Sequence, residues 1–345
     1  QRGEYGEQPF WMTVTLAAML GGIGFPGQGF GFGYGSMGNI GNPRQTAPSP
    51  TLVTGTNPCD SWIPVARISD MLLNPGKPYE FDGETRTYPD IRLVYWCGGN
   101  PFHHHQDLNR LVRAWRQPET VIVNEPWWTA TAKFSDIVLP STTTLERKDI
   151  GASSRDRFIM AMDKTIEPVG DALDDFDIFR GLSIRTGTHE AFTEGREPEE
   201  WLRHIYDRAR QSAAEKDITM PSYEEFWETG HIEIPRPAKP TVMFETFRAD
   251  PTSNPLPSPS GKIEIFSEVV DGFGYDDCPG HPVWREPIEW LGAPAAQTYP
   301  LHMISNQPRT RLHGQLDNGR VSRDDKIDGR EPIWIHPDDA AERKL

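Results

Sequence analysis

The sequence predicts an α/β protein built on a doubly wound, mostly parallel sheet. Three short apolar segments, residues 91–96, 120–125 and 136–140, have the length and composition of buried strands. Helical patterns separate them, and strands that alternate with helices at this spacing are typical of parallel βαβ units. With 345 residues, a hydrophobic content of 36% and 11 tryptophans, the chain can bury a substantial core.

The N-terminal segment predicts a helix followed by a long loop. Residues 7–20 read EQPFWMTVTLAAML, and Pro9 is tolerated in the first turn of such a helix. Between residues 21 and 41, nearly every second residue is glycine. This stretch contains the spacing of a phosphate-binding loop, but it follows a helix and precedes none. We therefore expect an extended loop that packs closely against its surroundings.

The predicted strands end in polar sequences at one edge of the sheet. The first strand ends in CGGNPF, and residues 103–117 then carry Leu108, Leu111 and Trp115 at helical spacing. Residues 127–134 predict a short helix between the other two strands. Ligands of such sheets bind beyond the carboxyl ends of the strands, so we expect a binding site there.

The remainder of the chain predicts a second, β-rich unit. Residues 188–248 read as charged helix and loop without evident chemistry, and residues 250–262 as a surface connection rich in proline and serine. Strands are predicted at residues 262–268, 299–305 and 332–335. The chain begins directly before a helix and ends on the first turns of another, so we interpret it as an internal fragment.

Charge and cysteine content disfavour several classes of partner. A net charge of −15 argues against binding to nucleic acid or to an anionic membrane. The longest nearly apolar stretch, residues 10–20, is too short to span a bilayer. The three cysteines form no CxxC pair, which argues against a disulfide framework and against a cysteine-held zinc or iron–sulfur centre.

Three adjacent histidines, His103, His104 and His105, follow the first strand. Adjacent side chains diverge on a helix and on a strand, so the three cannot converge on one metal ion. A GxSxG nucleophile elbow is also missing from the sequence. Two interpretations remain open. In the first, the histidines only cap and pack against a helix. In the second, Asn100 and one histidine in the first helical turn donate hydrogen bonds to a phosphate or ribose.

Polar groups at the other strand ends favour the ligand-binding interpretation. Asn124 and Glu125 end the second strand, and Arg147 follows the third. Glu125 could accept from ribose hydroxyls, and Arg147 could pair with a phosphate. Asp177 lies early in a predicted helix. Its carboxylate either complements the helix N-terminus or accepts two N–H groups from the Watson–Crick edge of guanine.

Four strings of sequence carry a family resemblance. They are WCGGNPFHHHQDLNR, VNEPWWTATAKFSDIVLPSTTTLER, PSGKIEIFS and ISNQPRTRLHGQLDNG. In this order and over nearly the whole chain, the sequence resembles the dimethyl sulfoxide reductase family of molybdenum enzymes, and within it the branch that reduces S-oxides and N-oxides.

The resemblance implies a bis(molybdopterin guanine dinucleotide) molybdenum cofactor and the domains that hold it. Residues 1–50 would be the end of a preceding α/β domain with its glycine-rich loop. Residues 51–295 would be a Rossmann-like α/β domain that binds the molybdopterin guanine dinucleotide, and residues 296–345 the start of a C-terminal β-barrel domain that also binds cofactor.

Matching motif positions imply the following cofactor contacts: Asn100, His104, Asn124, Glu125, Arg147, Asp177, Ser305, Asn306, Gln307, Arg311 and His313. Asp177 thereby becomes the preferred reader of guanine. No residue is assigned a catalytic role or a bond to the metal, because the serine that ligates molybdenum in this branch lies upstream of the matched region. Lys148 and Gly314 depart from the branch, which often has asparagine and serine at these positions.

The implied activity is oxygen-atom transfer from an S-oxide or N-oxide substrate. Electrons would come from a protein or from reduced nicotinamide, and the site of action would be the bacterial cytoplasm or periplasm, with the cytoplasm preferred. We expect these residues by themselves to be inactive. Three alternatives remain: a molybdoenzyme of the formate dehydrogenase or nitrate reductase type, a nicotinamide-dependent dehydrogenase, and a folding-incompetent fragment without activity. The position of the glycine-rich stretch and the absence of a following acidic ribose ligand argue against the dehydrogenase.

Overall fold

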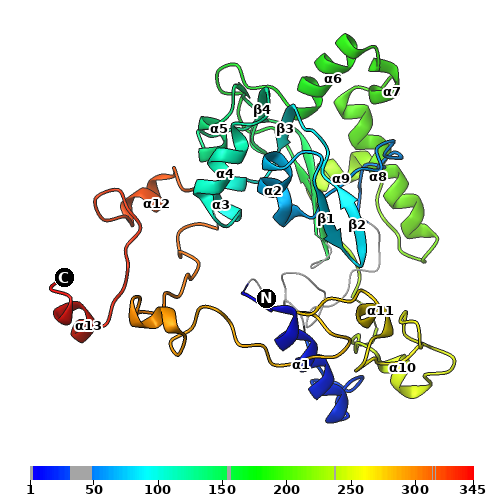
Figure 1. The fold of residues 1–345 in the computed structure, drawn as a ribbon. Coiled ribbons are helices and arrows are strands. Elements are labelled where there is room, and N and C mark those ends of the chain that lie inside the picture. The colour runs from blue at the N-terminus through cyan, green and yellow to red at the C-terminus, as the bar shows by residue number, and fades with distance from the viewer. Residues whose placement is uncertain (1–2, 32–48, 154–156, 237, 313, 315) are drawn as a thin grey trace.

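The computed structural model describes residues 3–31, 49–153, 157–236, 238–312, 314 and 316–345, and it contains a parallel three-stranded sheet (Figure 1). Its strands are β3 (Leu93–Cys97), β4 (Thr120–Asn124) and β5 (Ile137–Leu139), in the order β3-β4-β5. Both pairs are parallel, with Val123 opposite Val138 in the second. The α/β class and the three predicted strands are therefore confirmed. The strand order does not reverse within this sheet, so the doubly wound arrangement stays a prediction.

Four helices accompany this sheet. They are α2 (Ile68–Leu73), α3 (Pro101–His104), α4 (Leu108–Trp115) and α5 (Ala130–Lys133). A buried apolar cluster joins them to the sheet and consists of Leu72, Phe102, Leu111, Ala114, Trp115 and Val121. Burial of this surface is the main force that holds the helices on the sheet.

The prediction of one continuous helix over residues 103–117 is wrong. The first helical segment ends at His104, because the backbone of His105 is extended. Asp107, which precedes the second segment, has a left-handed backbone with φ of 46°. The Asp107 carboxylate then accepts a hydrogen bond from the Arg110 backbone N–H across 3.0 Å and caps α4. The histidines consequently lie at the end of the short α3 and directly after it.

Two antiparallel sheets were not predicted. The first is a hairpin of β1 (Pro78–Phe81) and β2 (Glu84–Thr87). The second contains β6 (Asp149–Ala152), β7 (Phe158–Met162) and β8 (His231–Glu233), in that order.

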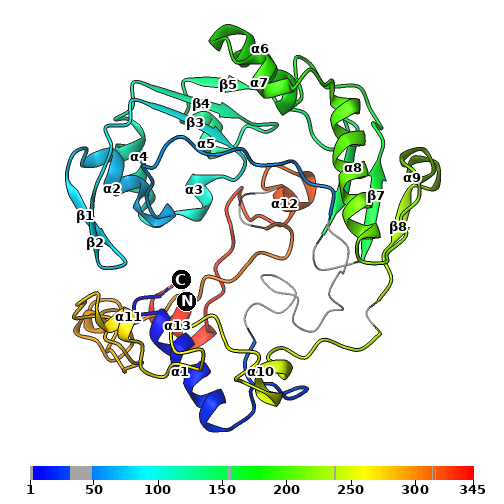
Figure 2. The same cartoon turned by 90° about the vertical axis from the view of Figure 1, so that its right-hand side faces the viewer.

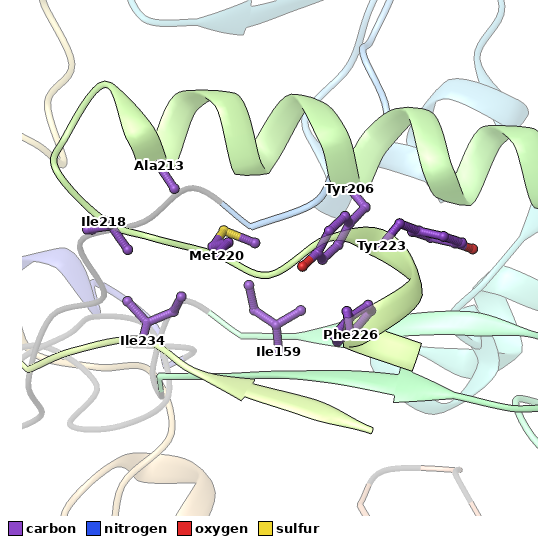
Figure 3. Close-up of a cluster of buried hydrophobic side chains, with 8 residues drawn as sticks. All are labelled: Ile159, Tyr206, Ala213, Ile218, Met220, Tyr223, Phe226 and Ile234. Carbon is purple, nitrogen blue, oxygen red and sulfur yellow. The ribbon is translucent and has the colours of Figure 1, made fainter. Parts of the chain in front are cut away.

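The parallel sheet is followed along the chain by α6 (Asp175–Thr186) and α7 (His189–Thr193). The next two helices, α8 (Pro198–Ala214) and α9 (Tyr223–Thr229), share a core with the second antiparallel sheet. Figure 3 shows the buried cluster between α8 and the strands β7 and β8. Tyr206 stacks on Phe226 with ring centroids 4.8 Å apart, and its hydroxyl donates to the Pro221 carbonyl across 3.0 Å. Burial raises the pKa of Tyr206 to about 12.

The predicted N-terminal helix is confirmed as α1 (Glu7–Met19), and it packs against a segment from much later in the chain (Figure 1). Gln8 accepts from the Val283 backbone N–H across 2.9 Å, and Arg248 donates to the Gly21 and Ile23 carbonyls. The remaining elements are η1 (Val65–Arg67), α10 (Glu245–Ala249), α11 (Glu268–Asp271), η2 (Pro294–Gln297), α12 (Arg320–Asp324) and α13 (Pro337–Glu342). Within the described ranges, no helix is both long and apolar enough for a membrane span.

The strands predicted at residues 262–268, 299–305 and 332–335 are wrong for this structure. These segments have no regular strand, and Met303 and Trp334 are 80% and 91% exposed. Apolar periodicity alone does not make a strand, because the backbone N–H and C=O groups of a strand need a neighbouring strand to bond with. In the described part of residues 296–345, no neighbouring strand is present. The start of a β-barrel therefore stays a prediction.

Candidate functional site

A glycine turn forms one side of the carboxyl edge of the parallel sheet. Gly98 and Gly99, which follow β3, have φ values of 73° and 70°, a left-handed conformation that favours glycine. A Cβ atom at either position would meet no heavy atom within 4 Å. The space over this turn is therefore open, and a ligand can approach the backbone directly.

Asn100, the next residue, carries a buried donor without a partner. The residue is 8% exposed, and its Oδ1 accepts a hydrogen bond from the Thr131 hydroxyl of α5. Its Nδ2 is buried and has no hydrogen-bond partner in the described part of the chain. An unpaired buried donor costs free energy, and such groups are rare unless a ligand or water satisfies them. Asn100 is therefore suited to hold an acceptor group of a bound molecule.

Asn124 is 5% exposed, and both ends of its amide are engaged. Its Oδ1 accepts from the Tyr95 hydroxyl of β3 across 2.9 Å, and its Nδ2 donates to Asp175 Oδ1 of α6 across 2.8 Å. The side chain thus joins two strands and a helix at the edge of the sheet. A direct contact of Asn124 with cofactor stays a prediction.

Glu125 is half-buried beside the exposed tryptophans of the same loop. Its carboxylate accepts from the Thr129 hydroxyl across 3.1 Å and from the Trp127 backbone N–H across 3.4 Å. Burial raises the pKa of Glu125, and these two hydrogen bonds oppose the shift. The carboxyl group retains free acceptor capacity, as a contact with ribose hydroxyls requires.

Arg147 lies after β5, and its side-chain hydrogen bonds within the described residues go to its own loop and to β6. Its Nη1 donates to the Thr142 carbonyl across 3.0 Å, and its Nε donates to Asp149 across 3.1 Å. Of the two adjacent residues Glu146 and Arg147, Glu146 is the buried one. The pKa of Glu146 is lowered, chiefly by hydrogen bonds from the Thr143 backbone and hydroxyl. Glu146 therefore shapes the loop, and Arg147 is the cation available to a phosphate.

Asp177 lies in the first turn of α6, as predicted. Its Oδ1 is 2.7 Å from Arg180 Nη2, and Arg180 also donates to Glu197 across 2.6 Å. The N-terminus of α6 carries two further acidic residues, Asp174 and Asp175. This concentration of carboxylates suits N–H donors better than it suits anions.

The C-terminal segment reaches the same region from residues 309–326, and Figure 2 shows α12 beside α3 and α5. Asn318 Nδ2 donates to the Trp128 carbonyl across 3.3 Å. Arg311 is 13% exposed at its side chain and pairs with Asp317 at 3.1 Å and Glu331 at 2.6 Å. The two parts of the predicted site thus meet at the carboxyl edge of the sheet.

The other predicted residues occupy varied positions. His104 is exposed on α3, and Ser305, Asn306 and Gln307 are exposed in an irregular segment. Gln307 Nε2 donates to the Arg311 carbonyl across 3.1 Å. His313 lies outside the described residues. In the ranges that the structure describes, no group of three or more His, Cys, Asp or Glu side chains is arranged to hold a metal ion.

Four residues of the site were not identified from the sequence: Thr131, Asp175, Asp317 and Lys326. The first two hold predicted residues, and the last two surround Arg311. For Asp175, the neighbouring Asp177 was the available signal, since both lie in one acidic helical turn. Thr131 carried no signal, because its partner Asn100 lies 31 residues away in sequence. Asp317 and Lys326 lie nine residues apart, and no motif marked either of them.

Two protein-family models match the chain at these regions. The model of the molybdopterin oxidoreductase family matches residues 1–185, more than half of the chain, and that of the molybdopterin dinucleotide binding domain matches residues 301–345. The chain belongs to the molybdopterin oxidoreductase family. The resemblance inferred from the sequence motifs is confirmed, and so is the bis(molybdopterin guanine dinucleotide) molybdenum cofactor at the level of this family. Membership favours this interpretation over a nicotinamide-dependent dehydrogenase.

Several curated members of the family are similar over the whole chain. The chain is 51% identical to biotin sulfoxide reductase of Cereibacter sphaeroides, covering 100% of this chain and 46% of that protein. It is 46% identical to the dimethyl sulfoxide/trimethylamine N-oxide reductase of the same organism, over 100% of this chain and 43% of that protein. It is 44% identical to trimethylamine-N-oxide reductase of Haemophilus influenzae, over 100% of this chain and 44% of that protein. The chain therefore spans about half the length of these relatives.

A solved structure with a similar fold is acetylene hydratase from Pelobacter acetylenicus. The two superpose with a TM-score of 0.53 at 20% sequence identity, over 75% of this chain and 32% of that one. At this identity the likeness concerns the fold alone. The domain boundaries expected at residues 50 and 295 stay predictions.

Proposed function

We propose that this chain belongs to an S-oxide or N-oxide reductase and holds the nucleotide ends of its bis(molybdopterin guanine dinucleotide) cofactor. One observation carries the proposal: the buried Nδ2 of Asn100 has no partner in the described residues and lies next to the open Gly98–Gly99 turn. The similarity to reductases of sulfoxides and N-oxides over the whole chain supports this substrate class. When bound, the cofactor supplies the two-electron redox chemistry of oxygen-atom transfer.

The first dinucleotide would lie along the carboxyl edge of the sheet. The backbone N–H groups of the glycine turn, the Asn100 amide and His104 would bind phosphate or ribose oxygens. Glu125 would accept from ribose hydroxyls, and the Arg147 guanidinium would pair with a phosphate in place of Asp149. Asn124 would act at the same edge, where it already connects β3, β4 and α6.

The guanine base would lie at the N-terminus of α6. Asp177 would accept the two N–H groups of its Watson–Crick edge. The acidic first turn of this helix supports the assignment, because it favours N–H donors and repels phosphate. Arg180, which now pairs with Asp177, would orient the carboxylate toward the base.

The second dinucleotide would contact the C-terminal segment. The residues proposed there are Ser305, Asn306, Gln307, Arg311 and His313. Arg311 would exchange one of its two carboxylate partners for a phosphate. In this proposal the parallel sheet is part of a doubly wound, Rossmann-like domain of residues 51–295, residues 1–50 end a preceding α/β domain, and residues 296–345 begin a β-barrel domain.

The residues proposed here bind and orient the cofactor, and none of them is assigned a proton-transfer or metal-binding role. The electron donor would be a protein or reduced nicotinamide, in the bacterial cytoplasm or periplasm. We expect the 345 residues by themselves not to reduce any oxide, because the relatives that do so are about twice as long.

Analysis of the purified holoprotein tests this proposal. We expect molybdenum with two guanine nucleotides per metal after acid hydrolysis, and oxidation of reduced viologen by biotin sulfoxide, dimethyl sulfoxide or trimethylamine N-oxide. Nitrate with reduced viologen, and formate with oxidised viologen as electron acceptor, serve as controls for the nitrate reductase or formate dehydrogenase alternative. Bound nicotinamide without molybdenum, or turnover of formate or nitrate alone, would contradict the proposal.

A further inference from the structure

His103 and Gly314 pack against each other more tightly than any side chain at position 314 would permit. A Cβ atom built on Gly314 would lie 2.5 Å from His103 Cγ, 2.7 Å from Cδ2 and 2.7 Å from Nδ1. The imidazole ring therefore fills the place that a side chain would take. The ring thus excludes a side chain at position 314 in this arrangement.

Further contacts join the same two parts of the chain. Asn318 donates to the Trp128 carbonyl across 3.3 Å, and α12 lies beside α3 and α5 (Figure 2). Asp317 is held by Arg311 at 3.1 Å and by Lys326 at 2.7 Å, and the side chains of both cations are largely buried. The described residues between 309 and 326 are thus paired with one another and contact the α/β unit at His103.

We propose that His103 and Gly314 form a clasp that holds residues 309–326 against the carboxyl edge of the sheet and retains the cofactor between the two parts. This inference rests on the proposed function for its cofactor, but the clasp itself is defined by contacts within the chain. His103 is a positioning residue in this scheme. Its ring sets how closely the segment that carries Arg311 approaches Asn100 and the glycine turn.

The charges around His103 make the clasp sensitive to pH. Burial lowers the pKa of His103 below the ordinary value of 6.5, Asp317 opposes the shift, and Arg311 and Lys326 reinforce it. All three charged groups belong to the segment that the clasp holds. The docked segment therefore favours the neutral imidazole, and as the pH falls below about 6.5 the undocked state gains the proton first and docking weakens.

Hydrogen exchange of peptides from residues 309–326 in the holoprotein measures docking directly. In Gly314→Ser, the hydroxymethyl group displaces the ring, and we expect exchange in this segment to be at least about five-fold faster than in wild type. His103→Ala combined with Gly314→Ser removes the clash and should return exchange toward the wild-type rate. Gly55→Ser, at a glycine with open space, and His105→Ala, at a half-buried neighbour of His103, are the matched controls and should exchange like wild type.

Two further readouts separate the clasp from the fold and from the proposed function. Exchange, corrected for its intrinsic pH dependence, should quicken from pH 7.5 to 5.5 in wild type and stay flat in His103→Gln. Guanine nucleotide should leave Gly314→Ser faster than the double variant. Unchanged exchange in Gly314→Ser, or no relief in the double variant, would overturn the clasp. If exchange changes in Gly314→Ser but nucleotide release does not, the clasp has no role in cofactor retention. If the holoprotein contains no guanine nucleotide, the proposed function is wrong, and the hydrogen-exchange result alone then tests the clasp.

Discussion

The side-chain amide of Asn124 donates a hydrogen bond to Asp175 across 2.8 Å and ties the end of β4 to the first turn of α6. The oxygen of the same amide accepts from the Tyr95 hydroxyl of β3 across 2.9 Å. One buried side chain thus fixes three elements that border the proposed cofactor site. The position of the α6 N-terminus, and with it the position of Asp177, depends on this contact.

Asn124→Ala should destabilise the fold by about 1–3 kcal/mol, because it removes two hydrogen bonds at a buried position and leaves their partners unpaired. Urea unfolding at pH 7 measures the loss. Asn254→Ala is the control, since its exposed amide bonds only to the nearby Asp250 carbonyl, and its change should stay within about 0.5 kcal/mol. Equal stabilities for the two variants would contradict the structural role of Asn124.

Glu125→Gln should make the protein more stable at pH 7. Burial raises the pKa of Glu125 above its ordinary value of 4.5, so the folded protein favours the neutral acid and carries a cost when the group ionises. The cost is absent well below pH 4.5 and grows as the pH rises through the folded pKa. Urea unfolding between pH 4 and pH 7 should show the two stabilities diverge with rising pH.

A matched control for this pH effect is Glu289→Gln, at an exposed position, which should show no such divergence. Glu125→Gln should at the same time bind cofactor less well, because the amide is a weaker acceptor for ribose hydroxyls than the carboxylate. A variant that loses stability at pH 7 would show that the carboxylate is favoured by its surroundings in the fold.

Arg147→Ala should weaken cofactor binding by about 1.5–3 kcal/mol, the loss of one charge-assisted contact to a phosphate. Guanine nucleotide retained after serial dilution of the holoprotein gives the measurement. Arg185→Ala removes an equal charge from the exposed face of α6, where the guanidinium donates to the Gly181 carbonyl, and should retain cofactor like wild type. Full retention in Arg147→Ala would remove this residue from the site.

Phe226→Ala should cost about 3–5 kcal/mol of stability, because the ring is fully buried and stacks on Tyr206 (Figure 3). Phe192→Ala, at a ring that is 37% exposed, should cost clearly less. Denaturant unfolding followed by tryptophan fluorescence compares them. Similar losses at both positions would mean that the cluster between α8 and β7 is not the core of this part of the chain.

Local signals explain what could be predicted. The strands β3, β4 and β5 are short, mostly apolar runs that alternate with helical patterns, and this arrangement is typical of a parallel sheet. The sheet of β6, β7 and β8 was missed because two of its strands are short and polar, and because β7 pairs with residues more than 70 positions away. The break between α3 and α4 was missed because helical periodicity continues through Asp107, whose left-handed backbone the pattern does not reveal.

The sequence by itself determined the α/β class, the three central strands, the helix α1 and, through four long motifs, the family and the residue types at the edge of the sheet. Only the tertiary structure decided which partners these residues have: Asp175 for Asn124, Thr131 for Asn100, and His103 for Gly314. Hydrophobic periodicity and turn-forming residues determine structure over a few residues, so neighbouring side chains in the sequence reveal them. Hydrogen bonds and close contacts between distant segments depend on how whole elements pack, and the burial that drives this packing is non-directional and specifies no individual pair.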